Sequence, residues 1–172
     1  MYRYLGFSLL AGGCTAMAAT LTNKLLIGKI NNEYYLSREV PGQLIGLGLS
    51  LIMVHRFKTN PLNIGVLSSL LFPIGVTADV MASKSDNPVP YLMAGSILRN
   101  ISYVGPAGCH TAAIVQICKS NNPNIFGTRN MVMGSLGATI GIIVGVSCDH
   151  NPILIACGYP ICLYLGWNKI IR

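Results

Sequence analysis

The sequence contains few charged residues and very few acidic ones. Only 10% of its 172 residues are Asp, Glu, Lys or Arg, and five of them are acidic, whereas soluble domains carry about 25% charged residues. So few carboxylates leave little for general acid and base catalysis. The short motifs of serine hydrolases, phosphate-binding loops and zinc proteases are also absent. We therefore expect a membrane protein that is not an enzyme.

Cysteine pairs and a concentrated basic patch are absent as well. The six cysteines form no CxxC pair. Cys109, His110 and Cys118 are close in sequence, but their spacing would spread them around a helix axis, so we expect no metal site and no other cofactor. The twelve Lys and Arg, which give a net charge of +7, lie singly or in pairs between apolar segments. This distribution makes nucleic acid an unexpected partner.

Long apolar segments dominate what is present. Hydrophobic residues make up 52% of the chain, and its mean hydropathy is +0.55. Several charge-free windows approach the ~20 residues that cross a bilayer core, and they are too long for strands. We predict an all-α polytopic transmembrane bundle of about six helices, forming one domain over residues 1–172. The predicted spans are 4–23, 40–55, 61–82, 89–118, 130–148 and 152–168, of which 89–118 is either one kinked helix or two shorter helices.

The polar joints between these spans indicate an orientation. We interpret the first apolar stretch as a retained span, although it has features of a secretory signal. With six spans, seven basic residues fall on one side of the membrane and four on the other. By the positive-inside rule, the side with seven is the matrix or cytoplasmic side, and both termini lie on it. The seven are Arg3, Arg56, Lys58, Lys119, Arg129, Lys169 and Arg172, and the four are Lys24, Lys29, Arg38 and Lys84.

Regularly spaced glycines indicate where helices approach each other closely. Gly137, Gly141 and Gly145 recur every four residues and would line one helix face without side chains. Gly42 and Gly46 repeat the pattern at the start of the second span. Such faces pack against a partner helix. The partner can be a helix of the same chain, which we favour, or one of another subunit.

A few polar residues lie inside the apolar segments, where they are costly to bury. Arg99 and Asp79 carry opposite charges and are candidates for pairing with each other. Asp79 could instead lie at the membrane interface near Lys84, and Arg99 could extend its side chain to the headgroups. His110 and Gln116 should face the protein interior, because lipid tails cannot satisfy their hydrogen bonds.

The segment from Gly105 through "CHTAAIVQICKSNNPNIFGTRN" to "GSLGATIGIIVG" resembles the core of the Root UVB Sensitive (RUS) membrane-protein family. In that family a helix of small residues ends in Asn-Asn, and a short polar segment with a lysine leads to a Gly-rich helix. Asn121 and Asn122 fit this register, with Arg129 at the lysine position and Gly141 in the Gly-rich helix. The resemblance implies an all-helical organellar membrane protein, with Asn121, Asn122 and Arg129 in a loop.

The chain departs from the family pattern at three positions. Ile125 stands where the family usually has an acidic residue, and Met133 and Gly134 stand where it has a Gln-Glu-like pair. We therefore expect a non-catalytic accessory subunit of a mitochondrial inner-membrane assembly, such as a respiratory-chain complex or the ATP synthase. Its partners would be other membrane subunits and structural lipids. The alternative is a RUS-type small-molecule carrier with Arg99, His110 and Gln116 around a central polar site.

Overall fold

The computed structural model describes residues 2–27, 61–117 and 123–171, together with Leu36, Val40, 42–45, Gly48 and Ile52. Side chains are described for most of these residues, but not for 2, 3, 61–64, 104–117, 123, 124, 126 and 168–171. Within this part the chain contains helices and no strands, which confirms the predicted all-α fold. The helices are α1 (Tyr2–Leu26), α3 (Pro61–Ser69), α4 (Leu71–Lys84), α5 (Val89–Ile117), α6 (Pro123–Ser147) and α7 (Pro152–Ile171).

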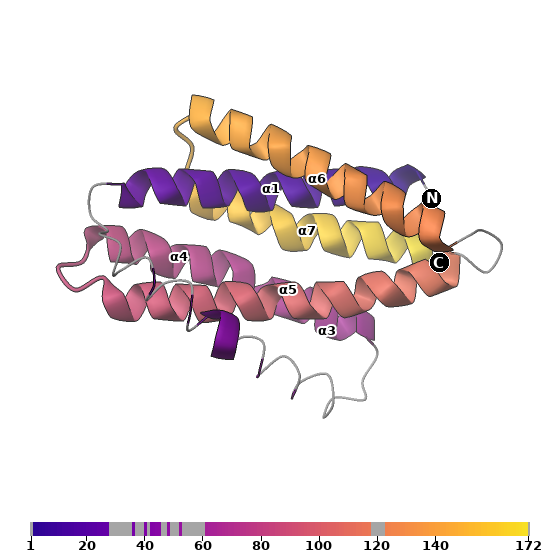
Figure 1. Ribbon diagram of the computed structural model, residues 1–172, viewed down its shortest axis with the longest axis horizontal. Coiled ribbons are helices and arrows are strands. Elements are labelled where there is room, and N and C mark those ends of the chain that lie inside the picture. Colours follow the sequence, from indigo (N-terminus) through magenta and orange to yellow (C-terminus); the bar gives the residue numbers. More distant parts are fainter. Residues whose placement is uncertain are drawn as a thin grey trace.

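The helices form two layers (Figure 1). One layer contains α1, α6 and α7, and the other contains α3, α4 and α5. In the first layer α1 and α6 run in the same direction, while α7 runs back between them and the second layer. As a result, α1 begins and α7 ends at the same end of the bundle.

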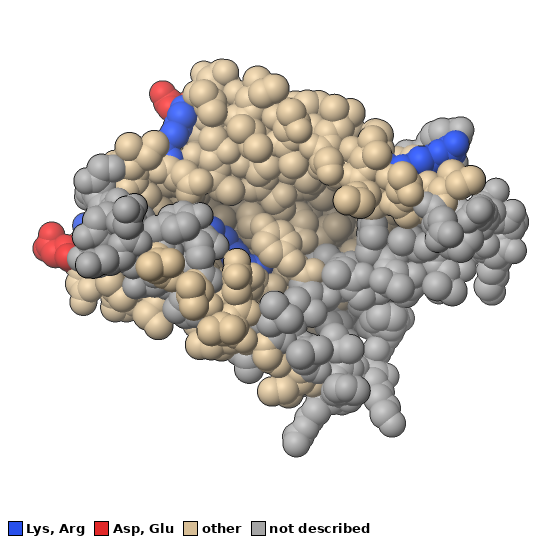
Figure 2. All heavy atoms as spheres, in the orientation of Figure 1, with Lys and Arg blue, Asp and Glu red and all other residues tan. Residues whose placement is uncertain are grey.

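Among the described residues, three helical segments are long and apolar enough to cross a membrane: Tyr4–Leu26, Gly65–Lys84 and Gly127–Ser147. Pro152–Trp167 is a shorter apolar helix. Figure 2 shows the charged side chains of the described part near the two ends of the bundle, with basic atoms also in the hollow between the layers. An uncharged outer belt of this kind suits contact with lipid tails. The chain is therefore a membrane protein.

Prolines explain two differences between the predicted spans and the helices. The span predicted over 61–82 is divided at Leu70 into α3 and α4. Pro73 lies in the first turn of α4, where it lacks an N–H for the carbonyl of Ser69 and its ring would clash with that carbonyl in a continuous helix. Pro123 begins α6, a position that suits proline because the first helical N–H has no partner inside the helix.

The early start of α6 corrects the position of Arg129. We predicted a loop at this residue, before a span over 130–148, but Arg129 lies inside α6 and its side chain is exposed. The region over 89–118, for which one or two helices were open, contains the single helix Val89–Ile117.

The core lies where the two layers meet. Ala11 and Ala18 of α1 pack with Phe72 and Val76 of α4 and with two residues of α7. The small side chains on α1 let the layers approach, and the aromatic rings fill the space that remains. The residues from α7 are Ala156 and Tyr159.

Candidate functional site

The glycine face of α6 packs against the backbone of α1. A Cβ added at Gly137 would overlap the carbonyl of Leu9, and one at Gly141 would overlap the carbonyl of Gly13. One turn later, a Cβ at Gly145 would lie 3.0 Å from Cβ of Thr20. Backbones this close permit Cα–H···O contacts worth about 0.5–1 kcal/mol each. The predicted face therefore contacts a helix of the same chain.

A second close approach joins α4 and α5. A Cβ at Gly75 would lie 2.8 Å from Cγ of Arg99, and one at Gly95 would lie 2.6 Å from Oδ1 of Asp79. Each charged side chain therefore crosses a glycine of the opposite helix. The same spacing occurs twice, because Asp79 follows Gly75 by four residues and Arg99 follows Gly95 by four residues.

This double crossing contains a buried ion pair. Nη1 of Arg99 lies 3.1 Å from Oδ2 of Asp79, whose side chain is fully buried, while that of Arg99 is 14% exposed. Nε of Arg99 also donates a hydrogen bond of 3.2 Å to the carbonyl of Gly95. Asp79 therefore lies in the protein interior, and the side chain of Arg99 points toward it. Removing one partner would leave the other charge uncompensated in a medium of low polarity.

An aromatic cluster lies one turn from the ion pair. The cluster consists of Phe72, Tyr103 and Tyr159. Its ring centroids are 5.7 Å apart for Phe72–Tyr103, 5.2 Å for Phe72–Tyr159 and 5.9 Å for Tyr103–Tyr159. The rings are tilted or meet edge to face, the arrangements that aromatic pairs prefer. They join α4, α5 and α7 across the two layers.

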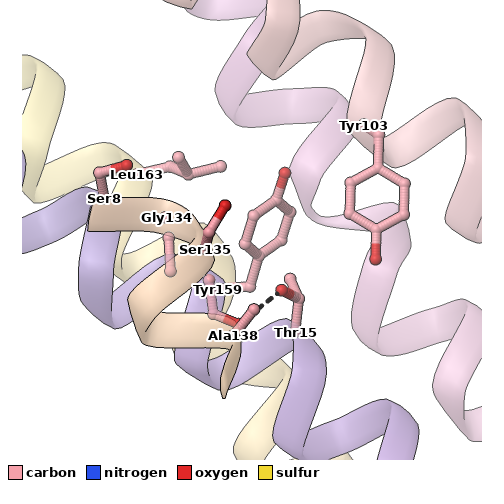
Figure 3. A pocket seen from close by; sticks show the side chains of 10 residues that line it. Ser8, Thr15, Tyr103, Gly134, Ser135, Ala138, Tyr159 and Leu163 are labelled. Carbon is pink, nitrogen blue, oxygen red and sulfur yellow. Dashed lines mark hydrogen bonds between the residues drawn. The ribbon is translucent and has the colours of Figure 1, made fainter. Parts of the chain in front are cut away.

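The two tyrosines also line a cavity of about 530 Å³ between the layers. Ser8, Gly12 and Thr15 of α1 and Ser135 of α6 line the other walls. Figure 3 shows Tyr103 on α5 across the space from the residues of α1 and α6, with the ring of Tyr159 between them. The described lining residues include hydroxyl groups and no charged side chain.

The cavity lies near the middle of the predicted membrane thickness. Ala11 and Thr15 are near the centre of the span Tyr4–Leu26, and Ala138 is near the centre of Gly127–Ser147. The hydroxyl of Thr15 donates to the carbonyl of Gly12 at 3.0 Å. Only 6% of Tyr159 is exposed, and no hydrogen bond of its hydroxyl occurs in the described part.

The remaining predicted residues are scattered. Gly42 is buried, and a Cβ there would overlap the side chain of Ser96 on α5. His110 and Gln116 belong to α5, but their side chains lie outside the described residues. Gly46, Asn121 and Asn122 also lie outside them. In the part that the structure describes, no three His, Cys, Asp or Glu side chains converge as metal ligands would.

Sequence reasoning missed the cavity and the glycines that accompany the ion pair. Ser8, Ala11, Gly12 and Thr15 follow the spacing of one helix face, so their alignment was visible in the sequence.

No match was found when the chain was compared with protein-family models, curated proteins and solved structures.

Proposed function

We propose that the chain is a non-catalytic accessory subunit of a larger integral-membrane assembly. The observation that carries this proposal is the apolar and largely exposed perimeter of α6. Met131 is 74% exposed, and Ile143 and Val146 are each 60% exposed. The glycine face of the same helix is occupied by α1. The rest of its surface is therefore available to lipid or to a neighbouring subunit.

The paired charges in the interior favour a structural subunit over a carrier. In a carrier, buried charged groups line a route for the substrate. Here the guanidinium of Arg99 is held by Asp79 and by the Gly95 carbonyl, and both residues lie at a crossing of two closely packed helices. These contacts fix α4 against α5, which is a structural role.

We further propose a mitochondrial inner-membrane location, in a respiratory-chain complex or the ATP synthase. Support comes from the excess of basic residues on one predicted side and from the resemblance to the RUS family. Lys24 and Lys84 lie near the ends of α1 and α4, at one end of the bundle, and Arg129 lies near the start of α6, at the other. Structural lipids would fill the remaining surface of α6.

Native electrophoresis tests the assembly proposal. The tagged full chain, extracted from its own membranes with mild detergent, should migrate in a large complex whose other subunits can be identified by mass spectrometry. Ile143→Trp keeps the helix apolar but adds bulk to the exposed face, so it should weaken that complex. Leu154→Trp, at a 71% exposed position on α7, is the matched control. Migration of the wild-type chain as a small species without partners would contradict the proposal.

A small-molecule carrier is the second candidate function, and the cavity is the observation that favours it. Its volume of about 530 Å³ lies within the range of roughly 300–1,000 Å³ that is usual for ligand pockets. A carrier would be recovered as an isolated, monodisperse protein with a bound ligand. It would also move that ligand across the membrane of a reconstituted vesicle, which a scaffold would not do.

A further inference from the structure

We propose that the cavity between α1, α5, α6 and α7 binds one uncharged lipid, whose small polar group is a hydroxyl or carbonyl. The inference does not rest on the assembly proposed above, because the site is formed by this chain alone. It rests on the depth of the cavity, on a lining with hydroxyl groups and no charged side chain, and on the hydroxyl of Tyr159, which has no hydrogen-bond partner within the described part.

The depth of the cavity selects against charged headgroups. Its walls include Thr15 and Ala138, which lie near the centres of their spans. A phosphate group would have to leave the aqueous interface to reach them, and an ion at this depth is costly unless it is paired. The nearest strong charge on α5 is Arg99, one turn before Tyr103, and it is already neutralised by Asp79 at 3.1 Å.

The lining provides hydrogen bonds suited to a neutral group. Tyr159 reaches into the cavity from α7, with its hydroxyl at the far tip of the ring (Figure 3). Only 6% of Tyr159 is exposed, and its hydroxyl has no hydrogen-bond partner within the described part, so the hydroxyl is free to bond a ligand in the cavity. The hydroxyl of Tyr159 would donate a hydrogen bond to a carbonyl or hydroxyl oxygen of a lipid, and the hydroxyls of Ser8 and Ser135 also line the cavity.

The shape of the site suits a lipid better than a compact soluble ligand. The cavity is open to the outside of the bundle. A polar group could therefore occupy the interior while its hydrocarbon tail extends past the apolar edge into the bilayer. Gly134 presents no side chain to the cavity, and a Cβ added there would make only an ordinary contact, 3.6 Å from Oγ of Ser8, so a tail has room at this position.

Photolabelling of the purified full chain in micelles tests the proposal. The probe is a dioleoylglycerol that carries a photoreactive diazirine on the acyl chain, and competitors are unlabelled dioleoylglycerol, a prenylated quinone and phosphatidylglycerol. We expect saturable labelling of peptides from α1 or α6. Either neutral competitor should displace the probe, and the stronger one identifies the lipid class. Phosphatidylglycerol should not displace it.

Two tyrosines on α7 provide a matched pair of variants. Tyr159→Phe removes the hydroxyl that lines the cavity and should weaken probe binding roughly three- to tenfold. Tyr164→Phe removes an exposed hydroxyl, from a residue 52% exposed, and should leave binding unchanged. Circular dichroism should show that both variants fold.

A cavity-filling variant keeps the test decisive if Tyr159→Phe is unstable. A Cβ at Gly134 would lie 3.6 Å from Oγ of Ser8, an ordinary contact. Gly134→Leu should therefore occupy the cavity and abolish saturable labelling in a folded protein. Labelling that is unsaturable, that phosphatidylglycerol displaces equally well, or that survives Gly134→Leu would overturn the proposal.

Discussion

Arg99 and Asp79 form an ion pair in which each side chain crosses a glycine of the opposite helix. Arg99 of α5 passes over Gly75 of α4, and Asp79 of α4 passes over Gly95 of α5. Asp79 is thus enclosed between the two helices, while the side chain of Arg99 stays 14% exposed. The four residues link the chemistry of the charges to the packing of α4 and α5.

Loss of one charge should destabilise the protein more than loss of both. We expect Arg99→Ala and Asp79→Ala each to lower the free energy of unfolding by about 3–5 kcal/mol, because each leaves a buried, uncompensated charge. The double variant should cost clearly less than the sum of the two. The measurement is helix loss by circular dichroism during titration of micelles with sodium dodecyl sulfate.

The exposed pair Lys24–Asp149 is the control for this cycle. Its Nζ–Oδ1 distance is 3.3 Å, similar to that of the buried pair, but the carboxylate side chain is 97% exposed. Alanine substitutions there should couple by no more than about 1 kcal/mol. If the buried pair showed simple additivity, the account of α4–α5 association would be wrong.

Gly95→Ala should disturb the ion pair by steric overlap, because it changes no charge. The added methyl group would lie 2.6 Å from Oδ1 of Asp79 and 2.9 Å from the carbonyl of Gly75, which we expect to cost about 1–3 kcal/mol. In an Asp79→Ala background the cost should fall but not vanish, since the carbonyl contact remains. Gly127→Ala, where nothing lies within 4 Å of the new atom, should cost nothing. The same detergent titration measures all these variants.

Leucine at Gly141 should separate α6 from α1. Its side chain would have to enter the backbone of Gly13, and we expect a loss of roughly 2–3 kcal/mol. Gly127→Leu on the same helix meets open space and replaces glycine with a better helix former, so it should be neutral or stabilising. Equal stability of the two variants, measured by thermal unfolding in micelles, would refute the packing role of the glycine face.

Two buried serines of α5 should respond differently to alanine. Ser102 is fully buried and donates a hydrogen bond of 2.6 Å to the carbonyl of Arg99, so Ser102→Ala should cost about 1 kcal/mol. Ser96 is equally buried, but its Oγ has no hydrogen-bond partner in the described part. Ser96→Ala should be neutral or stabilising, because it removes an unsatisfied polar atom. A cost at Ser96 equal to that at Ser102 would contradict this assignment, and detergent titration again provides the comparison.

The helical fold could be predicted from the sequence because it depends on local features. Long apolar windows bounded by charged joints require helices in a membrane, where every backbone group needs an internal partner. The face formed by Gly137, Gly141 and Gly145 was visible for the same reason, since a helix period aligns residues four apart.

The cavity could not be predicted because it depends on the relative positions of separate helices. Tyr103 and Tyr159 are far apart in sequence and become neighbours only when the two layers pack, with their ring centroids 5.9 Å apart. The loop assignment of Arg129 failed for a local reason, because Pro123 starts α6 earlier than the charge pattern suggested. From the sequence, the pairing of Arg99 with Asp79 was one of several alternatives. It depends on the close approach of α4 and α5 at Gly75 and Gly95, which the structure shows.

Extraction of membranes at high pH tests the central claim, that the chain crosses the bilayer, most directly. The treatment releases peripheral proteins but leaves membrane-spanning ones in the lipid pellet. We predict that the full chain remains in the pellet and is recovered only with detergent. Release of the chain into the aqueous fraction, followed by its recovery as a compact monomer in buffer without detergent, would contradict the account.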